Sequence, residues 1–152
     1  MSTISSEQLA SQLKCDYPQL HFCRGTTAKW SADAQKITYA NNIFDLLHET
    51  GHGILHHTTY YQDIDLLHQE RAAWDMATTI GQKYGITIPS KYIEGALDSY
   101  RDWLHRRSCC PCCGQTGVQS QDTLRYHCLN CNTTWQTNDA RCCALRRKKC
   151  PS

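Results

Sequence analysis

The sequence has no run of about 18 apolar residues, so we expect no membrane-spanning helix. Its amino terminus, MSTISSEQLASQLK, lacks the basic and apolar segments of a secretory signal peptide, which predicts a cytoplasmic protein. A large excess of charge of one sign is also missing, because 16 basic side chains stand against 14 acidic ones among 152 residues. These absences favour a globular chain with one domain, or one domain and a small appendage.

Cysteine and histidine are the residue types in excess. Eleven cysteines are present, and eight of them lie between Cys109 and Cys143 in closely spaced groups, which is typical of metal sites rather than of a disulfide framework. Five of the eight histidines fall between His48 and His68. The chain therefore has two candidate metal-binding regions, one rich in histidine and one rich in cysteine.

The charge balance divides the chain near Ser108. Residues 1–108 contain 10 basic and 12 acidic side chains, a net charge of −2, whereas residues 109–152 contain six and two, a net charge of +4. The second segment is poor in aliphatic residues, so a bound metal would have to supply its folding energy, about 10 to 16 kcal/mol in small zinc modules. We therefore predict two domains, 1–108 and 109–152.

Hydrophobic periodicity predicts short elements followed by three longer helices in the first domain. The short elements are a helix over 6–13, a strand over 19–23 and a hairpin with arms at 28–30 and 36–39. The first long helix begins at Asn41 or Asn42, both good N-caps, and the others span about 65–84 and 90–107. The predicted fold class is α+β: a small helical domain whose short sheet packs on the first long helix, followed by a small β zinc ribbon.

A metal-binding pattern lies inside the first long helix, where residues 48–52 read His-Glu-Thr-Gly-His, an HExxH. At a spacing of four residues, His48 and His52 project from one face of a helix and can share a zinc ion. Glu49 then lies beside the coordination position left for water. We therefore expect Glu49 to be the general base of a hydrolase.

A catalytic zinc site has three protein ligands and one open position. Glu70 starts the next predicted helix, and an antiparallel helix pair would bring its carboxylate to the same ion. The alternative is His68, which faces a different side of the helix because it is two residues away. The residues that follow Glu70 favour Glu70 over His68 as the third ligand.

The segments LHETGHG, from Leu47, and ERAAWDMA, from Glu70, resemble the ImmA/IrrE metallopeptidases, in which HExGH is followed by a helix of the form E-x-x-A-x-x-x-A. The resemblance implies that His48, His52 and Glu70 bind a catalytic zinc ion and that Glu49 activates water. It also implies hydrolysis of peptide bonds in a protein substrate. In this family the substrate is often a partner transcriptional repressor, such as a helix-turn-helix protein, in bacteria, phages or mobile elements.

Residues around the motif are candidates for supporting roles. Peptide hydrolysis needs a hydrogen-bond donor for the oxyanion, and Tyr60 and Tyr61 are the preferred candidates. Asp75 is either the group that holds a ligand histidine or an acid on the helix surface. His56 and His57 are expected at the surface.

The cysteine-rich segment contains a C-x2-C-x14-C-x2-C array. This array predicts a zinc ribbon with a second, structural zinc ion held by four thiolates, those of Cys110, Cys113, Cys128 and Cys131. Two neighbouring cysteines have the same spacing as the first pair and are alternative ligands: Cys109 and Cys112. The later cysteines are expected to be unpaired thiols: Cys142, Cys143 and Cys150.

The end of the chain is basic, with Arg141 and the run Arg146-Arg-Lys-Lys149. These residues could contact phosphates or could simply keep the tail solvated, and with Tyr126 or Trp135 as stacking side chains the ribbon could bind DNA or single-stranded nucleic acid. A protein adaptor or a purely structural ribbon is the alternative.

Two other functions fit the same patterns. An HExxH motif followed by a ribbon also resembles the SprT-like proteases that act on DNA-bound proteins, and there His68 would replace Glu70. A non-enzymatic regulatory protein would instead close the first metal site with a fourth ligand such as Cys15 or Cys23.

Overall fold

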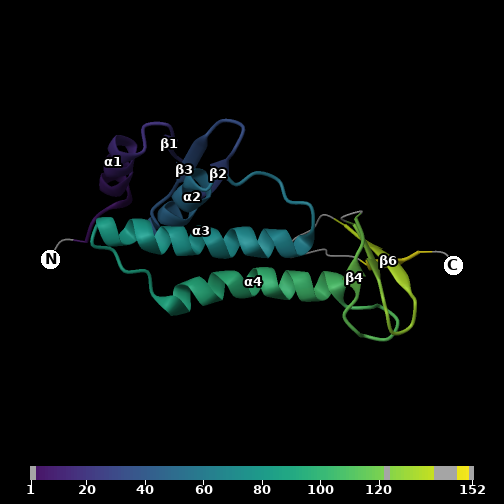
Figure 1. Cartoon of the computed structure of the whole chain (residues 1–152). Coiled ribbons are helices and arrows are strands. Elements are labelled where there is room, and N and C mark those ends of the chain that lie inside the picture. The colour runs from purple at the N-terminus through teal and green to yellow at the C-terminus, as the bar shows by residue number, and fades with distance from the viewer. Residues whose placement is uncertain (1–2, 122–123, 139–146, 151–152) are drawn as a thin grey trace. The chain divides into compact units, whose positions relative to one another are not determined.

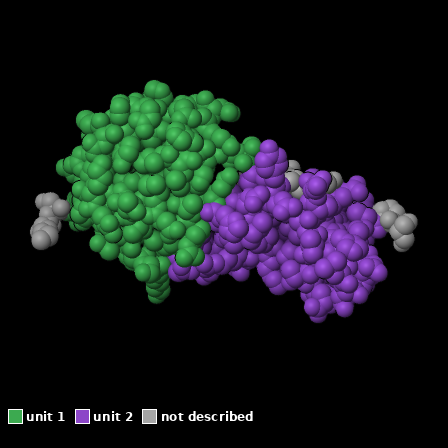
Figure 2. Space-filling view, viewed as in Figure 1, with its two compact units in different colours: residues 1–59, 69–93 green, residues 60–68, 94–152 purple. Residues whose placement is uncertain are grey.

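The structure is a computed structural model that describes residues 3–121, 124–138 and 147–150. Within these residues the chain has an α+β fold with four helices and two sheets (Figure 1), which confirms the predicted class. It forms two compact units (Figure 2). Unit 1 comprises Met1–Thr59 and Gln69–Ile93, and unit 2 comprises Tyr60–His68 and Glu94–Ser152. No helix in the described part of the chain is long and apolar enough to span a membrane.

Unit 1 begins with helix α1 (Ser6–Asp16), which starts at a capping box. The Ser5 hydroxyl accepts a hydrogen bond from the backbone N–H of Gln8, and the Gln8 side chain accepts one from the N–H of Ser5. These bonds satisfy two N–H groups that the helix itself leaves without partners. The face that α1 buries carries Leu9 and Leu13.

A three-stranded sheet follows α1. Its strands are β1 (His21–Arg24), β2 (Lys29–Ser31) and β3 (Lys36–Tyr39), in the order β1-β3-β2. β2 and β3 form the predicted antiparallel hairpin, and β1 runs parallel to β3. The central strand buries Ile37 and Tyr39 at alternate positions, as expected for a strand with one face on a core.

Helix α2 (Ile43–Ile54) contains the HExxH motif. It starts after Asn42, whose side-chain oxygen accepts hydrogen bonds from the N–H groups of Phe44 and Asp45. The helix contacts the sheet on one side, where a Cβ added at Gly53 would lie 3.1 Å from Trp30. On another side, a Cβ added at Gly51 would lie only 2.5 Å from the carbonyl oxygen of Ala73. Glycine at Gly51 therefore allows α2 to approach the following helix closely.

Two long helices complete the helical part, α3 (Asp63–Lys83) and α4 (Ser90–Ser108). Both were predicted within about two residues of these bounds, and each contributes residues to both compact units. In unit 1, α3 buries Ala73, Trp74, Ala77 and Ile80, which recur at helical spacing.

Unit 2 contains a four-stranded antiparallel sheet in the order β4-β5-β6-β7. The strands are β4 (Val118–Gln119), β5 (Arg125–His127), β6 (Thr134–Thr137) and β7 (Arg147–Lys149). Its small core centres on Tyr126 and Trp135, whose rings stack with centroids 5.6 Å apart. A Cβ at Gly117 would lie 2.3 Å from the Trp135 ring, so glycine is required there.

The ribbon belongs to a larger unit than its sequence boundary after Ser108 indicated. Asp63, at the start of α3, is buried and accepts a hydrogen bond from Nε of Arg107 at 2.7 Å and another from the Tyr126 hydroxyl. Its backbone N–H donates to the Gln119 side chain at 2.8 Å. The indole of Trp135 donates to the carbonyl of Arg107 at 2.9 Å. Unit 2 is therefore joined by a buried polar network as well as by its aromatic core.

Candidate metal centre

Helix α2 places His48 and His52 one turn apart on the same face. Their ring centroids are 4.6 Å apart, and each residue is only 8% exposed. The spacing of four residues produces this arrangement because a helix completes a turn every 3.6 residues. The predicted pair of imidazoles is therefore formed within unit 1.

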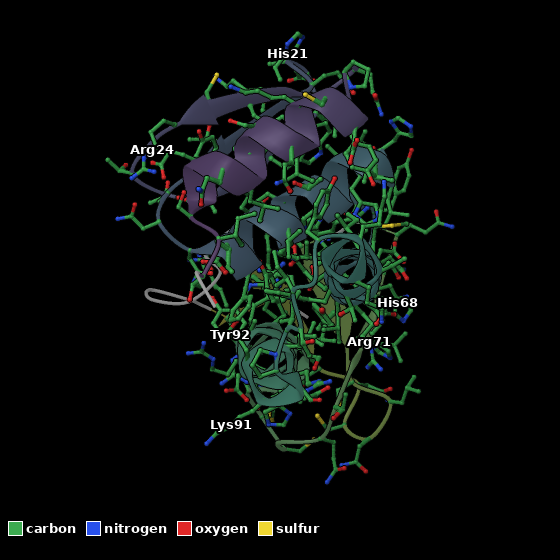
Figure 3. The ribbon with its side chains drawn as sticks, turned by 90° about the vertical axis from the view of Figure 1, so that its left-hand side faces the viewer. His21, Arg24, His68, Arg71, Lys91 and Tyr92 are labelled. Carbon is green, nitrogen blue, oxygen red and sulfur yellow. The ribbon has the colours of Figure 1, made fainter. Side chains whose placement is uncertain are left out.

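Helix α3 brings Glu70 to this pair, because the contact between Gly51 and Ala73 lets the two helices approach. The Glu70 carboxylate lies 3.0 Å from Nε2 of His48 and 3.3 Å from Nε2 of His52. His68 is exposed (Figure 3) and is not in the group. The structure thus brings together the three candidate ligands that the sequence favoured.

These side chains fit a metal ion better than they fit one another. His48 Nε2 and one oxygen of Glu70 are buried and 3.0 Å apart, yet neither makes a hydrogen bond with the described part of the chain. Such atoms are costly to bury without a partner. Nitrogen and oxygen ligands of a tetrahedral zinc ion lie about 3.3 Å apart, which is close to the two observed separations. His48, His52 and Glu70 could therefore hold one metal ion, and we call them the histidine–glutamate group.

The charges of this group are strongly coupled. Burial lowers the pKa of His48, but the neighbouring carboxylates of Glu49 and Glu70 outweigh it and raise the pKa to about 9. Burial raises the pKa of Glu70, but His48 and His52 outweigh it and lower the pKa to about 2. In the metal-free site, a protonated His48 and an ionised Glu70 therefore form a buried ion pair.

Glu49 borders the group without being one of its ligands. Its carboxylate lies 3.5 Å from Nδ1 of His48, on the opposite side of that ring from the nitrogen that faces Glu70. The Glu49 side chain is 16% exposed, compared with 7% for Glu70. A carboxylate at the edge of a metal site can exchange protons with a reacting group and with solvent.

Two neighbours of the ligands were not identified from the sequence. The Trp74 ring stacks on His48, with centroids 4.2 Å apart and planes 6° apart. Nδ1 of His57 lies 2.8 Å from Nδ1 of His52 and forms a hydrogen bond with it. The expectation that His57 is a surface residue was wrong, whereas His56 is exposed as expected. Burial and the neighbouring His52 lower the pKa of His57.

Of the other residues proposed around the motif, Asp75 does not join the site. Asp75 is a surface acid, 73% exposed and 3.9 Å from Arg71, so the alternative in which it holds a ligand histidine was wrong. Tyr60 and Tyr61 belong to unit 2, and Tyr61 is 84% exposed. Their assignment as oxyanion donors stays a prediction.

The cysteine-rich region forms a second group of candidate ligands. Cys110 and Cys131 have sulfur atoms 3.7 Å apart, and those of Cys113 and Cys128 are 3.5 Å apart. Four thiolates around a tetrahedral zinc ion lie about 3.8 Å apart. Hydrogen bonds with the side chain and backbone of Thr133 lower the pKa of Cys131 to about 6, which favours the thiolate. Four residues could therefore also hold one metal ion, and we call them the cysteine group: Cys110, Cys113, Cys128 and Cys131.

The remaining cysteines stand outside both groups wherever the structure describes them. Cys109 donates to the carbonyl of Gly114, and Cys112 is exposed, so neither replaces a member of the cysteine group. Cys15 and Cys23 are exposed and are not in the histidine–glutamate group. Cys150 is also in neither group, and two predicted thiols lie outside the described residues: Cys142 and Cys143.

The prediction that Tyr126 or Trp135 stacks on nucleic-acid bases was wrong. Tyr126 is 3% exposed and Trp135 is fully buried, since both alternate inward in their strands and form the ribbon core. The basic strand β7 is exposed along its length. A contact of this strand with phosphate groups stays a prediction; Arg141 and Arg146 lie outside the described residues.

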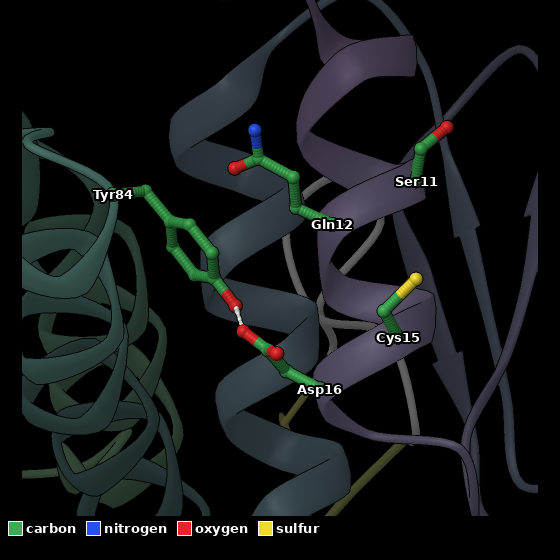
Figure 4. A pocket seen from close by; sticks show the side chains of 5 residues that line it. All are labelled: Ser11, Gln12, Cys15, Asp16 and Tyr84. Atoms are coloured by element: carbon green, nitrogen blue, oxygen red, sulfur yellow. Dashed lines mark hydrogen bonds between the residues drawn. The ribbon is translucent and has the colours of Figure 1, made fainter.

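An open pocket in unit 1 is lined by Ser11, Gln12, Cys15, Asp16 and Tyr84 (Figure 4). The Tyr84 hydroxyl donates to the Asp16 carboxylate there, and burial and this carboxylate raise the pKa of Tyr84. The pocket shares no residue with either candidate ligand group.

Comparisons with protein-family models, curated proteins and solved structures found no match to this chain.

Proposed function

We propose that this protein is a zinc-dependent metallopeptidase related to the ImmA/IrrE enzymes that its motifs resemble. The observation that carries the proposal is the convergence of two imidazole nitrogens and a carboxylate on one buried point, where His48 and Glu70 each have an atom without a hydrogen bond. A zinc ion held there would polarise a peptide carbonyl and activate a water molecule for attack.

Glu49 is the proposed general base. Its carboxylate is outside the ligand group and lies against the side of the His48 ring that faces away from Glu70. A change of side-chain rotamer would bring it toward the attacking water, from which it would accept a proton and pass it to the leaving amine. Glu70 and His52 serve as ligands and take no part in proton transfer. Trp74 shields one face of His48 from solvent by stacking on it.

The number of ligands favours an enzyme over a regulatory protein with a structural metal. Among the described residues, the histidine–glutamate group contains three residues, whereas the cysteine group contains four. Catalytic zinc sites have three protein ligands and an open position, and structural sites have four. We accordingly propose one catalytic and one structural zinc ion.

The first experiment measures zinc content and cleavage in parallel. Wild-type protein should contain two zinc ions per chain and should generate new termini in a proteome-derived peptide library, detected by mass spectrometry. Glu49→Gln should retain both ions and lose cleavage by about 100-fold or more. Asp75→Asn, at an exposed acid on α3, is the control and should cleave normally. Full cleavage by Glu49→Gln, or none by the zinc-loaded wild type, would refute the proposal.

A second comparison separates the two protease families. Glu70→Ala should lose one zinc ion, and His68→Ala should retain both. The opposite result would favour the SprT-like alternative. The proposed physiological substrate is a helix-turn-helix repressor, and cleavage of such a protein by wild type but not by Glu49→Gln would identify it.

A further inference from the structure

Helix α2 ends in a turn that folds the chain back onto the helix. The N–H of His57 donates to the carbonyl of His52 at 3.0 Å, and the N–H of His56 donates to the carbonyl of Gly53 at 3.2 Å. His56 itself has a φ of 54°, in the left-handed region. These features define a Schellman motif, with histidine at the position where glycine is usual.

The turn sets the His57 ring against His52. The two Nδ1 atoms are 2.8 Å apart, and the rings meet at 67° with centroids 5.0 Å apart. The carbonyl of His57 also accepts a hydrogen bond from the indole of Trp30 at 2.8 Å. His57 is therefore fixed through its N–H, its carbonyl and its ring, and its ring contacts a candidate metal ligand.

We propose that His57 is the positioning residue for His52, an inference that rests on the proposed metal site. A hydrogen bond between two Nδ1 atoms requires one ring to donate and the other to accept. His52 faces Glu70 with Nε2, which is therefore its metal-binding atom. A neutral imidazole that binds through Nε2 carries its proton on Nδ1. His52 thus donates, His57 accepts, and the proton of His57 resides on its own Nε2.

This contact limits rotation of the His52 ring and directs Nε2 toward Glu70. Groups that hold the second nitrogen of a ligand histidine typically raise metal affinity by about 10- to 100-fold. His48 is supported differently, by stacking on Trp74 and by Glu49 near its Nδ1. The two ligand histidines therefore depend on different neighbours, and each can be tested separately.

Three variants of the full chain test the role of His57. His57→Leu removes the acceptor and should weaken zinc binding at the histidine–glutamate group by about 10- to 100-fold. His57→Asn retains an oxygen near the position of Nδ1 and should restore the affinity to within about threefold. His56→Gly changes the exposed neighbour, fits its left-handed backbone and should leave the affinity unchanged. Affinity is measured by competition with a chelator, with the ribbon zinc already bound and folding checked by circular dichroism.

The wild type provides a test that needs no variant. In zinc-loaded protein, nitrogen-15 NMR of the imidazoles should show His52 protonated on Nδ1 and His57 protonated on Nε2. The reverse tautomer of His57, or equal zinc affinity of His57→Leu and wild type, would overturn the inference and leave the proposed function intact. Wild-type protein that binds no zinc at His48, His52 and Glu70 would instead refute the metal site itself.

Discussion

The two ligand groups of this chain lie in opposite surroundings. His48, His52 and Glu70 are all buried, within a unit whose apolar core extends from Leu9 on α1 to Ile80 on α3. The cysteine group lies beside a core with two large side chains, those of Tyr126 and Trp135, and one of its ligands, Cys113, is exposed. The histidine–glutamate group therefore lies in a large apolar core, whereas the cysteine group lies beside a very small one.

Under the proposed function, this difference separates a metal that would serve chemistry from a metal that would serve folding. A buried cluster of ionisable side chains lowers stability unless its members are paired. The attraction between the charges of His48 and Glu70 offsets only part of this cost in the metal-free site, because the two facing atoms make no hydrogen bond. We expect the larger apolar core of unit 1 to let it fold before it binds zinc. The ribbon buries little apolar surface, so a zinc ion held by the cysteine group would contribute the missing free energy.

Removing the metals should have the largest effect and should affect the units unequally. A strong chelator should unfold the ribbon, because its core is small, while unit 1 retains its helices. Hydrogen exchange followed by mass spectrometry should show protection lost in β5 and β6 and kept in α2. Equal loss of protection in both units would contradict the comparison.

Breaking the buried ion pair of unit 2 should have the next largest effect. Asp63 and Arg107 have side chains 2% and 3% exposed, and Asp63→Asn would leave the buried guanidinium without this carboxylate. We expect unit 2 to lose about 3 to 5 kcal/mol of unfolding free energy. Asp98→Asn is the control, since its pair with Arg101 is exposed and contributes less than about 1 kcal/mol. Urea unfolding with zinc present should distinguish the two variants. Similar losses of unfolding free energy in Asp63→Asn and Asp98→Asn would show that Asp63 contributes no more to stability than a surface acid.

The two candidate histidine ligands were predictable because helical spacing determines which side chains share a face, whereas Glu70 was chosen over His68 because the residues after it resemble a family pattern. Four residues separate His48 from His52, and a second helix had to supply the third ligand. The same rule would have identified Trp74, which lies four residues after Glu70 and faces the same side. Asp75 is one residue further and points to solvent.

Other features depended on contacts that no local pattern specifies. The position of His57 follows from a left-handed residue, His56, and a histidine there gives no signal of a Schellman turn. The burial of Asp63 depends on Arg107 and Tyr126, which lie 44 and 63 residues later in the chain and could not be paired with it from the sequence. Folding must bring such residues together before their pairing exists.

Zinc binding to the histidine–glutamate group should depend on pH. Because the pKa of His48 is raised to about 9, this histidine is protonated at pH 7, and zinc must displace its proton. Affinity should therefore fall about tenfold for each pH unit below 9. In the metal-free protein the same shift stabilises the fold fully below pH 6.5, and this contribution is lost as the pH rises through 9.

Calorimetric titration of protein that already holds the ribbon zinc, in buffers with different ionisation enthalpies, counts the protons released. We expect His48 to contribute about one proton at pH 7 and none well above pH 9, while a zinc-bound water with a pKa of about 7 adds its own proton as the pH rises. No release at pH 7 would show that His48 is neutral in the metal-free site.

The smallest effect should come from His56, whose left-handed backbone favours glycine. His56→Gly should raise the unfolding free energy of unit 1 by about 0.5 to 1 kcal/mol, because the strain of the left-handed conformation outweighs the added entropy of the unfolded chain. Its exposed side chain is not in either ligand group, so zinc content should not change. Thermal unfolding of zinc-loaded variant and wild type measures the difference, with the unit 2 transition as an internal reference. A lower stability of His56→Gly would show that the imidazole makes a compensating contact, and the turn that positions His57 would then depend on histidine at both places.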